Sequence, residues 1–461
     1  MKVSIGVPDP DEAPPTDICC VVDISDSMTQ TASGITDGKT EYVELGYSLL
    51  DLVKHAMKTI AKTMRDKDRL ALITFNDGAI VNFDFTEMGE LGKGQALDII
   101  DKIKAQGGTN IYKALETAVT LIAQRDNKSR NPSILFFTDG VPNYSPARGE
   151  IEAMKKLKRQ KKFTHPIHTM GFGMYDRLNS YMLLEIASNS GGFYGHIKDA
   201  SNVGTIFVNA IANMMTTSCM DVKMQLKFND GNCVLGMQEV IMGTFPHKMQ
   251  GDTLTADLGS IRFGQNLDFL IKFKDDFKLT PESFCDLSLT YESQGQQRTK
   301  EFKGLKLITA SRKEVLPHQF RYEVVKHLTY VLREWKKDIK GCYALTVDIM
   351  DKYKDNEDDF SQGMIENLKR QQLVSLEKAK YMQKWGKHQY RQLLRSLNMQ
   401  VKTNFRDYSL DTFGGELFNQ VSDDADDIYN SMDPPKPSLS ELMNKQAPII
   451  QSAQQFAQIL N

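Results

Sequence analysis

Oxygen-bearing side chains recur at three places in the chain where an apolar segment begins or ends. The apolar run 18–22 leads directly into residues 23–27, which have the pattern D-x-S-x-S. A hydroxyl follows two glycines at Thr109, and the apolar run 133–138 leads into Asp139. Alternate positions of an extended segment share a face, so the carboxylate and both hydroxyls of the first pattern can point to one place. Mg²⁺ prefers oxygen ligands, so the predicted chemistry is the binding of a divalent cation.

The predicted site combines five residues from these three segments. A D-x-S-x-S pattern alone could also be a helix cap with polar neighbours. Here a strand precedes it, a G-G-T segment opens a helix at residue 111, and a second strand ends in T-D-G; this context makes the motif specific. An oxygen-only ligand set favours Mg²⁺, with Mn²⁺ or Ca²⁺ as substitutes. The expected metal ligands are Asp23, Ser25, Ser27, Thr109 and Asp139.

The elements that position these residues alternate between strands and helices over residues 17–216. Such alternation predicts an α/β domain with a doubly wound, mostly parallel, Rossmann-like sheet, and ligands of these sheets bind at the carboxyl ends of the strands. The predicted strands cover 18–23, 69–75, 133–138 and 165–172, and the predicted helices cover 45–64, 90–103, 111–124, 150–161, 176–188 and 202–215.

The rest of the chain divides into two further regions. Hydrophobic residues alternate with polar ones over much of 217–310, which predicts an antiparallel β-sandwich. The opening residues 3–7 alternate in the same way before a proline-rich stretch, so residues 1–16 are expected to be a strand and linker of that sandwich. Residues 311–461 are expected to be helical, with helices over 320–339, 364–397 and 439–460.

Composition excludes several classes of function. The 461 residues carry 57 basic and 59 acidic side chains, and this balance does not favour nucleic acid as a partner. The sequence contains no run of eighteen apolar residues, so no membrane span is predicted. The first residues lack the apolar core of a signal peptide. The six cysteines show no C-x-x-C spacing, so reduced thiols and a cytoplasmic location are expected.

Motifs of the common enzyme classes are missing from the sequence. There is no G-x-x-x-x-G-K-[ST] loop for nucleotide hydrolysis and no G-x-S-x-G nucleophile elbow. We therefore expect a binding protein without catalytic turnover. A structural subunit of a larger assembly, in which the metal only stabilises the fold, is the alternative.

The five predicted ligands resemble, position by position, the metal-ion-dependent adhesion site of von Willebrand factor type A domains. Segments such as 68–72, 167–173 and 191–194 are similar to those of intracellular eukaryotic members, in which a β domain and a helical region commonly follow. The resemblance implies that Asp23, Ser25, Ser27 and Thr109 lie nearest the metal and that Asp139 often acts through water. It also implies that an Asp or Glu of a partner protein fills the open coordination position.

The sequence departs from this family pattern in two respects. Asp26 stands where family members often have glycine, and its charge could tighten the cation or repel an acidic partner. The chain has no RING or U-box array of cysteines and histidines, although some similar proteins carry ubiquitin-ligase modules. A role as substrate adaptor would therefore require a separate ubiquitin ligase.

Overall fold

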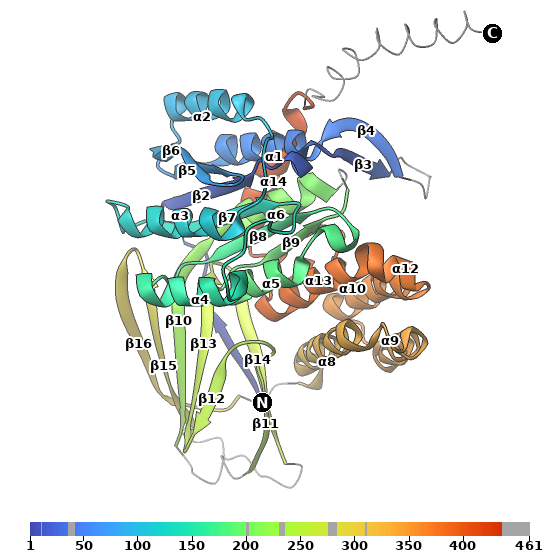
Figure 1. Ribbon diagram of the computed structural model, residues 1–461. Helices are drawn as coiled ribbons and strands as arrows, with labels where there is room; N and C mark the ends of the chain where they lie inside the picture. The colour runs from blue at the N-terminus through green and yellow to red at the C-terminus, as the bar shows by residue number, and fades with distance from the viewer. Residues whose placement is uncertain are drawn as a thin grey trace, which may run out of the picture.

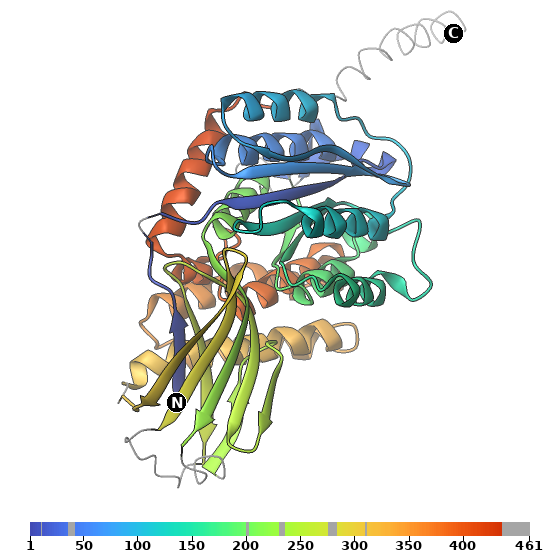
Figure 2. The same ribbon diagram turned by 90° about the vertical axis from the view of Figure 1, so that its left-hand side faces the viewer.

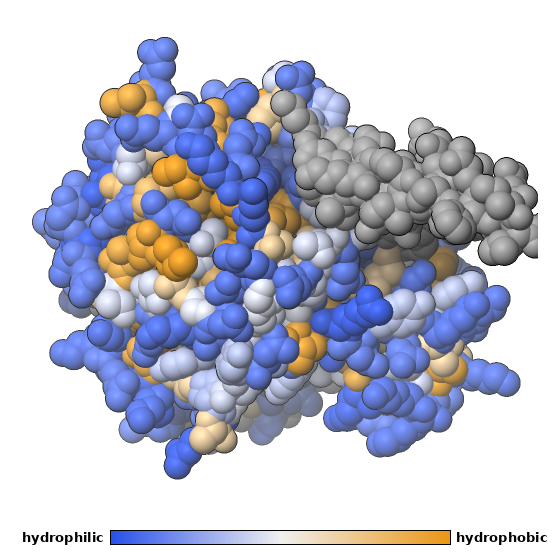
Figure 3. Space-filling model, turned by 45° about the horizontal axis from the view of Figure 1, so that its top comes forward, coloured by the Kyte–Doolittle hydropathy of each residue, from blue (hydrophilic) through white to orange (hydrophobic). Residues whose placement is uncertain are grey.

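The structure, a computed structural model, describes residues 1–10, 12–35, 42–199, 202–229, 236–274, 284–308 and 311–435. A layered α/β part lies above two antiparallel sheets, and the helices of the carboxyl-terminal region lie beside both (Figures 1 and 2). Most of the face in Figure 3 is hydrophilic, with hydrophobic side chains gathered over a limited area. In the described residues no helix is long and apolar enough to cross a membrane.

The α/β part is built on a six-stranded sheet in the order β6-β5-β2-β7-β8-β9. All neighbouring pairs are parallel except β5 and β6. β2, β5 and β7 are buried along their whole length, which explains why they appear in the sequence as continuous apolar runs. The strands are β2 (Thr16–Asp23), β5 (Arg69–Phe75), β6 (Ala79–Glu87), β7 (Asn131–Thr138), β8 (Ile167–Phe172) and β9 (Tyr194–Ile197).

Helices cover both faces of this sheet. One core packs α1 and α6 against the sheet, and a second core packs α3, α4 and α5 against the other face. The doubly wound, mostly parallel fold class is thereby confirmed. The elements are η1 (Asp26–Thr29), α1 (Leu49–Thr63), α2 (Glu90–Lys102), α3 (Ile111–Gln124), α4 (Gly149–Lys161), η2 (Tyr175–Arg177), α5 (Ser180–Ser188) and α6 (Val203–Met215).

The predicted helix over 45–64 was wrong at its start. Residues 45–48 belong to β4 (Tyr42–Ser48), which pairs with β3 (Thr31–Ile35) in a separate two-stranded antiparallel sheet. The helix begins only at Leu49, because Ser48 caps it: Asp51 N donates to Ser48 Oγ at 3.1 Å, and Ser48 N donates to Asp51 Oδ2 at 2.8 Å. The predicted helix over 176–188 likewise divides into η2 and α5.

The antiparallel part consists of two sheets that share one hydrophobic core, in the orders β1-β14-β11 and β12-β13-β10-β15-β16. β1 pairs with β14, with Val3 opposite Phe269, so the amino-terminal strand joins the β domain as the sequence predicts. The strands are β1 (Lys2–Gly6), β10 (Thr217–Phe228), β11 (Met237–Ile241), β12 (His247–Gln250), β13 (Thr253–Arg262), β14 (Asn266–Phe273), β15 (Cys285–Ser293) and β16 (Gln296–Leu305).

The carboxyl-terminal region is helical, but the long helix predicted over 364–397 is interrupted by two π-helical segments, η4 and η5. α14 returns to the α/β part and packs on α1 and α6 (Figure 1). The predicted helix over 439–460 lies outside the described residues. The elements are α8 (Arg312–Glu334), α9 (Ile339–Tyr353), α10 (Asp359–Asn367), η4 (Leu368–Leu373), α11 (Val374–Leu376), α12 (Ala379–Tyr381), η5 (Met382–Gly386), α13 (Lys387–Met399), η6 (Tyr408–Phe413) and α14 (Glu416–Ser431).

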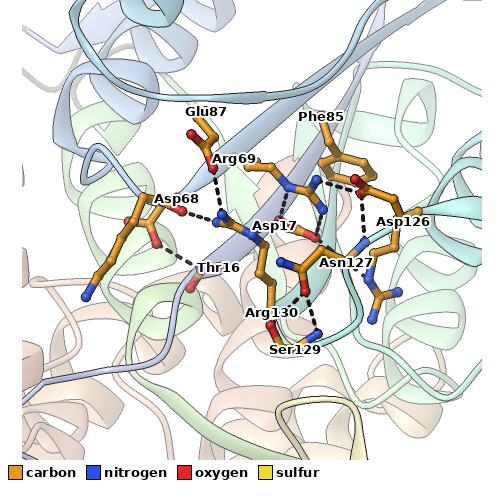
Figure 4. A network of polar contacts seen from close by, with 12 residues as sticks. Thr16, Asp17, Asp68, Arg69, Phe85, Glu87, Asp126, Asn127, Ser129 and Arg130 are labelled. Atoms are coloured by element: carbon orange, nitrogen blue, oxygen red, sulfur yellow. Dashed lines mark hydrogen bonds and ion pairs between the residues drawn. The ribbon is translucent and has the colours of Figure 1, made fainter.

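A network of arginines anchors the amino end of β2 (Figure 4). Arg69 donates to both carboxylate oxygens of Asp17, at 2.9 and 2.8 Å, and also to Asp126 at 2.8 Å. Arg125 and Arg130 approach the same buried Asp17 at 3.7 and 3.9 Å. This network fixes the end of β2 opposite to the predicted metal site.

Candidate functional site

The loops after β2 and β7 meet at the carboxyl edge of the sheet. Ser27 Oγ donates to Asp139 Oδ1 at 2.7 Å, and the hydroxyls of Ser25 and Ser27 are 3.0 Å apart. Asp23 Oδ1 accepts a hydrogen bond from the backbone N–H of Ser25 at 2.9 Å. Because β2 and β7 are parallel neighbours, the side chains that follow them come from sequence positions more than a hundred residues apart and still touch.

Thr109 reaches the same place from the loop before α3. A Cβ on Gly140 would lie 3.7 Å from Thr109 Oγ1 and 3.9 Å from Asp23 Oδ2, so both oxygens border one point. The Thr109 backbone is held by a reciprocal pair of bonds: its N–H donates to Asn143 Oδ1 at 2.8 Å, and its carbonyl accepts from Asn143 N at 2.9 Å. The structure thus brings together all five residues that the sequence selects.

Two supporting residues were not predicted from the sequence. Thr138, the last residue of β7, donates its hydroxyl to Asp23 Oδ2 at 2.6 Å and so fixes the orientation of that carboxylate. Asn143 orients the Thr109 loop from four residues beyond Asp139. The T-D-G pattern contains the first of these side chains, but only strand pairing shows that it faces Asp23.

Asp26 ties the first loop to the loop that carries Thr109. Its N–H donates to the carbonyl of Gly107 at 2.9 Å, and its Oδ1 accepts from Gly107 N at 3.1 Å. Gly107 has a φ of 83°, a left-handed conformation that glycine adopts without strain. The Asp26 carboxylate therefore helps to hold the two loops together.

The two carboxylates of the cluster lie in a poorly solvated place. Asp23 is fully buried, and burial together with the nearby charge of Asp139 raises the pKa of Asp23 to about 7. Burial also raises the pKa of Asp139, although the hydrogen bond from Ser27 opposes this shift. Within the described ranges no ion pair involves either carboxylate.

This donor set fits a hard divalent cation. Two buried carboxylates that form no ion pair within the described residues are costly as anions, and a bound cation would offset that cost. The remaining donors are hydroxyls, so every candidate ligand atom is oxygen, as Mg²⁺ prefers. Over the described part of the chain no cluster of three or more His, Cys, Asp or Glu side chains offers another metal site.

A cavity of about 440 Å³ opens beside Asp139. Its lining includes Phe172, Tyr175 and Arg177, and Arg177 donates to Gln30 Oε1 at 3.1 Å. Tyr175 has a φ of 61°, a conformation that is unfavourable for a residue with a side chain and that tends to occur at functional sites. The recess beside the cluster is lined by Arg177 and Lys198 as well as by the carboxylates of Asp139 and Asp199, so its wall carries charges of both signs.

The family comparisons agree with this fold. Residues 18–141 match the family model of the von Willebrand factor type A domain, and residues 358–427 match a model described as VWA / Hh protein intein-like. The first match runs from β2 to the residue after Gly140, and the second from the start of α10 into α14. The chain therefore contains a von Willebrand factor type A domain.

Curated relatives are distant and longer than this chain. An uncharacterized protein of Escherichia coli K12, YfbK, is 28% identical over 233 residues, which are 50% of this chain and 37% of that protein. A probable E3 ubiquitin-protein ligase of Arabidopsis thaliana, WAVH2, is 23% identical over 50% of this chain and 31% of that protein. The chain thus spans about a third of the length of these two relatives.

Solved structures share the fold at low sequence identity. A von Willebrand factor type A protein of Catenulispora acidiphila is 14% identical, with a TM-score of 0.54, and the match covers 76% of this chain and 82% of that one. The human COPII-coat protein Sec24c is 12% identical, with a TM-score of 0.50, over 86% of this chain and 60% of that one. At these identities the likeness concerns the fold alone.

Proposed function

We propose that the protein is a metal-dependent protein-binding module and that Asp23, Ser25, Ser27, Thr109 and Asp139 hold its Mg²⁺. The observation that carries the proposal is the convergence of these oxygen side chains, from three separate loops, at the carboxyl edge of the sheet. When bound, the cation offers a coordination position to a carboxylate of the partner. The chain's own residues orient the site: Thr138 fixes Asp23, and Asn143 fixes the loop of Thr109.

Exposed side chains around the site support a protein as the ligand. Val141 and Tyr144 lie two and five residues after Asp139 and are 47% and 52% exposed, and Tyr175 on the recess is 49% exposed. Tyr144 Cε2 would lie 3.5 Å from a Cβ on Gly108, so this ring stands next to the Thr109 loop. Aromatic side chains are enriched at protein–protein interfaces, and the charge of Arg177 favours an acidic partner.

A second candidate is a role as substrate adaptor for a separate ubiquitin ligase. It rests on the 23% identity with the plant protein whose name describes a probable ubiquitin ligase. This candidate uses the same binding site and differs only in what happens to the bound protein.

The experiment is affinity capture of partners from a cell extract by the full chain in Mg²⁺, in EDTA, and with Thr109→Ala. We expect capture of a defined partner in Mg²⁺, loss in EDTA, and at least about a tenfold loss with Thr109→Ala, since one direct contact of this kind is worth about that factor. Thr120→Ala, on the same α3 but away from the site, is the matched control. Equal capture in all conditions would contradict the adhesion mechanism and favour a purely structural metal in a larger assembly.

A further inference from the structure

A cavity of about 1100 Å³ lies between the α/β part and the helical region, and it shares Lys198 with the recess beside the candidate metal site. Lys198, directly after β9, and Asn202, directly before α6, contribute to one wall. The opposite walls come from η4 and η5, and the segment before η6 completes the lining. Its volume is slightly above the range of about 300–1,000 Å³ that is typical of cavities that bind small organic molecules.

The cavity combines positive charge with aromatic rings. Lys198 Nζ lies 5.7 Å from the ring centre of Trp385, and the guanidinium of Arg370 lies 5.9 Å from that of Tyr408. Two further cations, Lys384 and Arg406, line the same space, against two carboxylates, those of Glu366 and Glu377. Glu366 is paired with Arg370. A ligand with negative charge and a planar ring would complement this lining.

Lys198 is the cation best suited to meet such a ligand. Among the residues that the structure describes it forms no ion pair, and burial lowers its pKa. It is also held in place, because it follows β9 directly and β9 is tied to α13: His196 N donates to Gln392 Oε1 at 2.6 Å. The carboxylates of Asp199 and Asp407 oppose this shift without forming an ion pair with Lys198, and a partly buried ammonium group of this kind gains more from a directly bound anion than an exposed one does.

Two polar atoms of the lining are buried without a hydrogen-bond partner in the described structure. Asn202 Nδ2 is a donor, and Gln389 Oε1 is an acceptor. Buried polar atoms of this kind are costly, and a bound molecule with both donor and acceptor groups would satisfy them. The heteroatoms of a nucleobase provide such groups.

Both π-helical segments line this cavity, η4 through Arg370 and Gln371 and η5 through Lys384 and Trp385. π-helical turns are rare and are found frequently at functional sites. Here η5 crosses close to α11: a Cβ on Gly386 would lie only 2.9 Å from Ser375 Cβ. The two π-helical segments thus place the ring of Trp385 and the cations Lys384 and Arg370 around the same space.

We propose that this cavity binds a ring-bearing organic anion of nucleotide size, with its base against Trp385 and its anionic group at Lys198. The ligand is bound and not hydrolysed, and its binding does not require a cation at the candidate metal site. The proposal therefore goes beyond the function proposed above and can fail separately from it.

The test is calorimetric titration of the full chain with ATP and with GTP in EDTA, so that the candidate metal site takes no part. Adenosine and inorganic triphosphate serve as probes that carry only the ring or only the anion. We expect one binding site for at least one nucleotide and weaker binding of both partial probes. Lys198→Gln and Trp385→Leu should each weaken binding by at least about tenfold, while Lys248→Gln, on exposed β12, leaves it unchanged.

Three results would overturn the proposal. The first is that neither nucleotide binds at millimolar concentration. The second is that inorganic triphosphate binds as tightly as ATP, which would leave no role for the ring. The third is that both cavity variants, shown by circular dichroism and melting to be folded, bind like the wild type.

Discussion

Asp26 illustrates how a single residue departs from the family pattern for a structural reason. Its carboxylate accepts a hydrogen bond from the backbone of Gly107, so it positions the loop that carries Thr109. The charge itself is less important for this task than the oxygen. Asn in its place would keep an acceptor, whereas Ala would remove it.

We therefore predict that Asp26→Asn binds Mg²⁺ within a few-fold of the wild type, whereas Asp26→Ala binds it about tenfold more weakly. The reason is that loss of a hydrogen bond to a charged group costs about 1.5–3 kcal/mol, part of which appears as misplacement of Thr109. Titration calorimetry with Mg²⁺ measures both variants. Equal loss in the two would mean that the charge, and not the positioning, is what matters.

Asp17 is a second residue whose role depends on burial. It is fully buried among Arg69, Arg125 and Arg130, so Asp17→Ala would leave buried positive charge without its partner. We expect the free energy of unfolding to fall by about 3–5 kcal/mol. Asp126→Ala is the control, because that carboxylate is 84% exposed and contacts the same Arg69; its loss should change the free energy of unfolding far less. Urea denaturation distinguishes the two, and similar losses would refute this account.

At the same scale, the five candidate ligands were predictable and their supports were not. Asp23, Ser25, Ser27, Thr109 and Asp139 follow from motifs at the ends of apolar runs. Thr138 and Asn143 act through contacts that depend on strand pairing and on the course of one loop, and neither leaves a pattern along the chain.

Among the elements, those with a buried apolar face were predicted best. β5 and α3 have the predicted bounds, because a continuous apolar run and a 3.6-residue period are strong signals. The start of α1 was wrong because residues 45–48 continue the helical pattern although Ser48 caps the helix. The short β9 and the edge strand β6 were missed, since their formation depends on the neighbouring strand.

The contact between α5, η2 and α13 contains a buried histidine. His388 Nδ1 is 2.6 Å from Ser180 Oγ, and its Nε2 is 2.8 Å from the carbonyl of Tyr175. Burial, the nearby His196 and Lys387 lower the pKa of His388 to about 2. In the unfolded chain histidine has its usual pKa near about 6.5. Below that pH the unfolded state takes up a proton that the folded state does not.

We therefore predict that stability falls as the pH drops from 7.5 to about 5, by up to about 1.4 kcal/mol per pH unit for this histidine. The sign follows from the lowered pKa of His388 in the folded state. The stability that neutral His388 contributes is fully present above the pKa of histidine in the unfolded chain, and it is lost as the pH falls below that value. His388→Gln, which keeps a hydrogen-bonding side chain, should flatten the dependence. Urea midpoints at several pH values measure this, and an unchanged slope in the variant would contradict it.

In the whole molecule, α14 closes the helical region back onto the α/β part. Ala425 is fully buried in the core that contains α1 and α6, and Tyr429 packs edge-on against His55 with ring centres 4.7 Å apart. This return was not predictable, because residues 411–433 are acidic and their apolar positions are few. Only the tertiary structure shows that α14 packs with one side against the α/β part (Figure 2).

We predict that Ala425→Leu overpacks this contact and lowers stability by about 1–3 kcal/mol. Limited proteolysis should then cut within residues 416–431, because the helix no longer docks. Asp424→Leu introduces the same residue, leucine, at the exposed neighbouring position. It should have little effect on stability or on proteolysis. If both variants resist proteolysis equally, α14 is not held by this contact.

The central claim is that three loops of the von Willebrand factor type A domain build one divalent-cation site. Its most direct test is calorimetric titration of the metal-free full chain with Mg²⁺ and Mn²⁺, for the wild type, Asp23→Ala, Thr109→Ala and Thr120→Ala. The account predicts one site per chain in the wild type and Thr120→Ala, no detectable binding in Asp23→Ala, and at least about tenfold weaker binding in Thr109→Ala. Unchanged binding in folded Asp23→Ala, or no binding of either cation by the wild type, would contradict it.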